Sequence, residues 1–68
     1  MATIMEKDVL LEYATFGYLI KNRDTKEAQD DLNKMYEIKQ WLYSTDEEDI
    51  DYESTKEQVK KIRLKYEN

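Results

Sequence analysis

The sequence predicts an all-α fold, in which an antiparallel helical hairpin is followed by a shorter third helix within one domain, residues 1–68. Three segments repeat apolar residues with helical spacing, and each follows a residue that can cap a helix. One glycine and no proline leave few tight turns, which disfavours a β-rich fold. With 68 residues, the chain is near the lower size limit for a core that folds unaided.

The first helix is expected over about residues 4–21. Thr3 and Glu6 have the spacing of a capping box, and Asn22 can end the helix in a left-handed conformation. Two apolar stripes on nearly opposite sides suggest a helix that is central in the fold or covered by another chain. One stripe holds Met5, Val9, Tyr13, Phe16 and Ile20, and the other holds Ile4, Leu11, Ala14 and Tyr18.

The second helix is expected over about residues 25–43 and the third over 55–66. Asp24 with Glu27 and Ser54 with Glu57 have the start spacing. A short connection, residues 22–24, makes the first two helices antiparallel neighbours. The expected buried stripes are Ala28, Leu32, Met35 and Leu42 in the second helix, and Val59, Ile62 and Tyr66 in the weaker third.

An acidic loop, residues 44–53, is expected between the second and third helices. A calcium loop that began at Asp49 would need a glycine where Ser54 stands and a glutamate where Lys60 stands. We therefore expect a solvated linker without a metal site. The basic side of the third helix, Lys56, Lys60 and Arg63, is likewise interpreted as a solvated face rather than a nucleic-acid site.

The composition disfavours enzymes. The chain has no histidine and no cysteine, which removes the commonest general base, the commonest zinc ligands and any Ser-His or Cys-His pair. It also has no glycine-rich phosphate loop. We expect neither catalysis nor a cofactor.

The main functional hypothesis is a non-enzymatic protein–protein interaction module that self-associates through its first helix, with a dimer favoured. Tyr18 and Trp41 lie off the main stripes of their helices, so each is either an exposed interface anchor or covered by the third helix. The alternative hypothesis is an acidic nucleic-acid mimic that blocks the basic groove of a nucleic-acid-binding protein, although eleven interspersed cations weigh against it. The candidate partner-binding residues are Leu11, Tyr18, Trp41, Glu47, Glu48, Asp49 and Asp51.

The net charge of −5 argues against direct binding to nucleic acid or to anionic lipid. No uninterrupted apolar stretch is long enough to cross a bilayer, so a cytoplasmic protein is expected. In size and composition alone, the chain resembles the small accessory and inhibitor proteins of bacteriophages and mobile elements.

Overall fold

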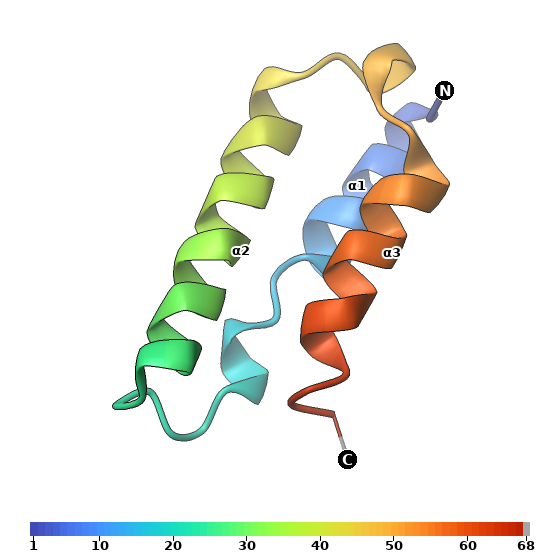
Figure 1. The fold of residues 1–68 in the computed structure, drawn as a ribbon. Helices are drawn as coiled ribbons and strands as arrows, with labels where there is room; N and C mark the ends of the chain where they lie inside the picture. The colour runs from blue at the N-terminus through green and yellow to red at the C-terminus, as the bar shows by residue number, and fades with distance from the viewer. Residues whose placement is uncertain (68) are drawn as a thin grey trace.

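The computed structural model describes residues 1–67, and all regular structure in this range is helical. The elements are α1 (Ile4–Tyr13), the 3-10 turn η1 (Gly17–Leu19), α2 (Lys26–Ser44), the 3-10 turn η2 (Glu47–Asp49) and α3 (Tyr52–Arg63). Figure 1 shows α1 and α3 side by side, with α2 facing them across the core. The predicted small three-helix domain is confirmed. Among the described residues, no helix is long and apolar enough to span a membrane.

The first helix is much shorter than expected, because α1 ends at Tyr13 rather than near Lys21. The sequence that follows, Thr15 to Tyr18, consists of residues with modest or poor helix propensity. The Thr15 hydroxyl donates to the Leu11 carbonyl at 2.8 Å. An α3 side chain also intervenes, since Arg63 Nη1 donates to the Tyr13 carbonyl at 2.8 Å. A segment containing η1 therefore replaces the expected three-residue connection to α2.

The early end of α1 changes which of its residues are buried. Met5 and Val9, from the first predicted stripe, are exposed, whereas Leu10, which belonged to neither stripe, is fully buried. The predicted stripe assumed one continuous helix. Because the chain turns after α1, Phe16 and Ile20 reach the core from the following segment instead.

Two of the three predicted helix starts differ from the structure. The Thr3–Glu6 capping box is confirmed, with both of its reciprocal hydrogen bonds present. At α2, however, the cap is Thr25 rather than Asp24, because Thr25 Oγ1 accepts from the backbone N–H of Ala28 at 3.1 Å. The expected start was therefore one residue early.

The start of α3 differs more, because its cap is Asp51 rather than Ser54. The Asp51 carboxylate accepts from the backbone N–H of Ser54 at 3.1 Å, so Ser54 lies inside the first turn of the helix. Because α2 also extends to Ser44, the predicted acidic loop, residues 44–53, shortens to residues 45–51.

This correction can be tested with two matched substitutions. Asp51→Ala should lower the free energy of unfolding by about 1 kcal/mol, because it leaves a helix-terminal N–H without its acceptor. Ser54→Ala should change it by less than about 0.5 kcal/mol, since the side chain is exposed within a helix. Urea denaturation of both variants measures the two costs. A larger loss at Ser54 would contradict the observed cap.

Cationic side chains from other elements donate hydrogen bonds to the carbonyl groups that are left unpaired at the ends of α1 and α2. Neither α1 nor α2 has a basic residue in its last turn. Arg63 serves the end of α1, as described above, and Lys7 Nζ donates to the Thr45 carbonyl at the end of α2 at 2.7 Å. Such contacts complement the negative end of each helix dipole. They also join α3 to α1, and α1 to the end of α2.

Candidate functional site

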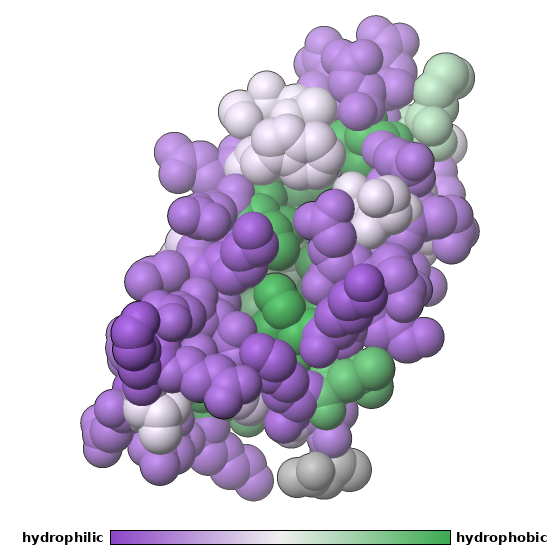
Figure 2. All heavy atoms as spheres, viewed as in Figure 1, coloured by the Kyte–Doolittle hydropathy of each residue, from purple (hydrophilic) through white to green (hydrophobic). Residues whose placement is uncertain are grey.

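A groove of about 240 Å³ lies between α2 and α3. Figure 2 shows hydrophobic atoms exposed along a seam on this face, with hydrophilic side chains on both sides of it. Trp41 is 44% exposed, so α3 covers it only in part. The groove is lined by Lys34, Glu37, Ile38 and Trp41 from α2 and by Thr55 and Gln58 from α3.

The segment Thr45–Asp51, which we call the acidic connector, is an ordered part of the fold. Ile50 is 1% exposed and belongs to the core. The backbone N–H of Ala2 donates to the Glu47 carbonyl at 3.1 Å, so the start of the chain is fastened to the connector. The side chains of Glu48 and Asp49 remain exposed. The connector therefore holds its carboxylates on a fixed backbone.

The Trp41 end of the groove lies beside the acidic connector. The Trp41 carbonyl accepts from Thr45 Oγ1 at 2.6 Å, and Thr45 is the first residue of the connector. On the other wall, Asp51 closes the connector and precedes Thr55 by one helical turn. The acidic connector, with the five carboxylates of Asp46, Glu47, Glu48, Asp49 and Asp51, therefore continues directly from the end of α2 that carries Trp41.

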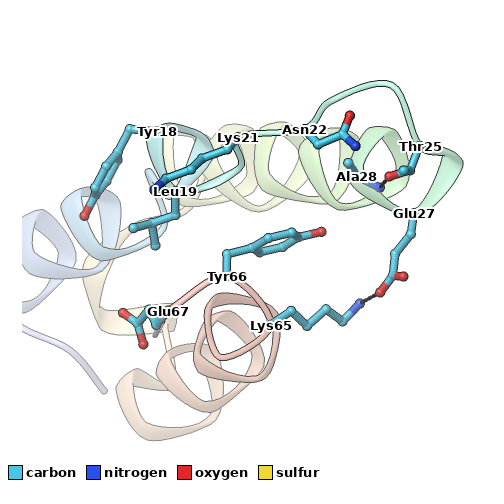
Figure 3. A pocket seen from close by; sticks show the side chains of 10 residues that line it. All are labelled: Tyr18, Leu19, Lys21, Asn22, Thr25, Glu27, Ala28, Lys65, Tyr66 and Glu67. Carbon is cyan, nitrogen blue, oxygen red and sulfur yellow. Dashed lines mark hydrogen bonds and ion pairs between the residues drawn. The ribbon is translucent and has the colours of Figure 1, made fainter.

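A second, wider hollow of about 1000 Å³ lies between the η1 region, the start of α2 and residues 65–67, which follow α3. Figure 3 shows the Tyr66 ring between its two walls and Tyr18 at one end. Lys21, Glu27 and Lys65 also line this hollow, so it carries both signs of charge.

The structure does not bring all the predicted partner-binding residues together. Tyr18 is largely exposed but lines the wider hollow, whereas Trp41 lines the groove. Leu11 lines neither hollow and is half-buried against the core. The acidic residues Glu47, Glu48, Asp49 and Asp51 lie in or next to η2, at the Trp41 end of the groove.

A buried carboxylate, Asp31, fastens the C-terminal segment to α2. The Tyr66 hydroxyl donates to Asp31 Oδ2, and Lys65 Nζ lies 3.3 Å from the same oxygen. Lys65 also pairs with Glu27 at 3.1 Å. We call this set of Glu27, Asp31, Lys65 and Tyr66 the Asp31 latch.

From its charge, Asp31 is expected on the solvated face of the second helix, and this prediction is wrong because the residue is buried. Asp31 follows Ala28 by three residues and precedes Met35 by four, so helical spacing places it beside the buried stripe. This spacing predicts that Asp31 is buried. The general preference of aspartate for solvent predicts the opposite, and it holds only when no partner compensates the charge.

The latch predicts a loss of stability at alkaline pH. Burial, the hydrogen bond to Asp31 and the charges of Asp31 and Glu27 raise the pKa of Tyr66 to about 12. An unfolded tyrosine titrates near pH 10, so the contribution of the neutral phenol is fully present below about pH 10 and is lost as the pH rises toward about 12.

Urea denaturation across this range should therefore show a smaller alkaline loss for Tyr66→Phe than for the unmodified chain. Tyr43→Phe, at an exposed tyrosine, is the matched control and should leave the loss unchanged. Equal losses in all three proteins would contradict the latch.

Among the described residues, no group of three acidic side chains is placed to hold a metal ion. Comparison with protein families, curated proteins and solved structures found no match to this chain.

Proposed function

We propose that the protein is a non-enzymatic interaction module whose α2–α3 groove binds a basic amphipathic helix of a partner protein. The observation that carries the proposal is the half-exposed Trp41, which lines the groove on the end of α2 that leads directly into the acidic connector. Recognition of amphipathic helices in apolar grooves is a recurring mode of protein–protein interaction.

The dimensions of the groove favour anchor side chains over a whole small molecule. Small-molecule pockets usually enclose about 300–1000 Å³, and this groove holds about 240 Å³ along an exposed seam. One or two apolar side chains of a partner helix would fill it against Ile38 and Trp41. Tryptophan is among the residues that contribute most to interface energies.

The charge of the partner follows from the connector rather than from the groove walls. The walls contribute one charge of each sign, Lys34 and Glu37. The connector adds five carboxylates and no cation of its own. A partner helix with lysine or arginine at the end that meets the connector would therefore be attracted, and an acidic helix would be repelled.

Trp41 is the only tryptophan, so its fluorescence reports on the groove directly. Two synthetic helical peptides with identical leucine spacing serve as probes, one with lysine and one with glutamate at all polar positions. The lysine peptide should change Trp41 emission in a saturable way, and the glutamate peptide should not.

Two sets of substitutions distinguish the contribution of the groove to binding from that of the acidic connector. Gln58→Arg places a cation in the groove at an exposed position, and it should weaken binding of the lysine peptide about tenfold, or about 1.4 kcal/mol. Neutralising the connector with Glu48→Gln and Asp49→Asn should also weaken binding. The matched control, Asp24→Asn with Asp30→Asn, removes two exposed carboxylates, one just before α2 and one near its start, and should have little effect.

Equal affinity in all these variants would contradict the proposal. Binding that salt abolishes, but that Gln58→Arg leaves unchanged, would instead support the acidic mimic, in which carboxylates alone occupy a basic groove.

A further inference from the structure

The outer side of α1 presents apolar residues to solvent. Met5 is 78% exposed and Val9 is 49% exposed, while Leu10 and Ala14 fill the core from the other side of the chain. Met5, Val9 and Tyr13 follow one another at intervals of four residues, so they form one row along α1.

The contact between Tyr13 and Arg63 shows which side of α3 lies next to the apolar row of α1. Arg63 binds the Tyr13 carbonyl, and its guanidinium carbon lies 4.5 Å from the centre of the Tyr13 ring. Lys60 precedes Arg63 by three residues, and Lys56 precedes Lys60 by four, so both lysines share the side of α3 that carries Arg63. Because α1 and α3 lie side by side, this cationic row runs next to Met5 and Val9.

A third row completes the surface. Asp8 and Glu12 follow Met5 and Val9 by three residues and lie on the side of α1 that is farther from α3. All four charged residues, Asp8, Glu12, Lys56 and Lys60, are exposed, and none forms an ion pair with another residue in the range 1–67. The face therefore carries a cationic row, an apolar row and an anionic row in parallel.

We propose that this three-row face binds a second copy of the chain, with a two-fold axis that runs along α1. This axis places Met5 and Val9 against the same residues of the other copy. It also places the cationic row of each copy opposite the anionic row of its partner, so the charge pairing occurs twice. A two-fold axis across the helices would set like charges against each other instead. The charge pattern thus selects a parallel pairing.

The expected dimer is weak and leaves the groove open. Stable interfaces bury about 800 Å² per partner, and four exposed apolar residues at most, Met1, Ile4, Met5 and Val9, contribute here. On α3, Gln58 lies roughly 200° around the helix from Lys56, so the groove and the dimer face occupy different sides. A dimer would present two grooves to a partner. The proposal is independent of the groove's occupant. It keeps the self-association expected from the first helix, but it moves the interface from the stripe with Leu11 and Tyr18 to the one with Met5 and Val9.

Charge exchange provides the test. One variant carries Asp8→Lys and Glu12→Lys, so both of its outer rows are cationic. The other carries Lys56→Glu and Lys60→Glu, so both are anionic. The unmodified chain should show a concentration-dependent dimer in sedimentation equilibrium, and each variant alone should be monomeric. An equimolar mixture of the two variants should form a one-to-one dimer.

Far-UV circular dichroism of each variant checks that the helices remain. If a variant loses helical structure, the neutral pair Asp8→Asn and Glu12→Gln replaces it and should weaken the dimer about tenfold. An unmodified chain that stays monomeric at every concentration would overturn the proposal. So would variants that dimerise alone as well as the unmodified chain, or a mixture that stays monomeric.

Discussion

Phe16→Ala should lower the free energy of unfolding by about 3–5 kcal/mol, the largest single effect expected in this chain. Phe16 is fully buried, although it lies outside every helix, in the segment between α1 and η1. Native stabilities of small domains are often only about 5 kcal/mol, so the variant should retain at most about 2 kcal/mol and should melt at a much lower temperature. Thermal unfolding followed by circular dichroism measures the loss.

The neighbouring residue provides the control. Thr15→Ala removes an exposed side chain and one hydrogen bond to the Leu11 carbonyl, so it should cost no more than about 1 kcal/mol. If Phe16→Ala also cost less than about 1 kcal/mol, the segment after α1 would not be packed as described.

Asp31→Ala should lower the free energy of unfolding by about 1–3 kcal/mol, because it leaves the Tyr66 hydroxyl without its acceptor and Lys65 without one of its two carboxylates. The adjacent Asp30 is a matched control, since it is exposed and pairs with the exposed Lys26. Asp30→Ala should cost less than about 0.5 kcal/mol.

A double-mutant cycle with Tyr66→Phe isolates the latch. The cost of Asp31→Ala should be smaller when Tyr66 has already been replaced, because the two residues share one hydrogen bond. Equal costs for Asp30→Ala and Asp31→Ala, or fully additive effects in the cycle, would contradict a buried latch.

Features set by local chemistry could be predicted from the sequence. The capping box at Thr3 and the buried stripe of the second helix depend on residues within a few turns of each other, and the structure confirms both. The stripe holds Ala28, Leu32, Met35 and Leu42, all of which are buried.

Features set by distant contacts could not be predicted in this way. The end of α1 depends on Arg63, which is fifty positions away in the sequence. At α3, both Asp51 and Ser54 are suitable caps, and the burial of Ile50 next to Asp51 favours the earlier start. The helical spacing also predicts that Trp41 lies away from the buried stripe of the second helix. It could not show that the indole borders a groove, because that depends on how α2 and α3 pack.

The most direct test of groove recognition is a two-dimensional ¹H–¹⁵N NMR titration of the labelled protein with the lysine peptide. The largest shift changes are expected at the Trp41 indole and at the amides of Ile38, Thr55 and Gln58, with smaller changes along the acidic connector. Changes confined to the connector, with none at Trp41 or Gln58, would contradict binding in the groove.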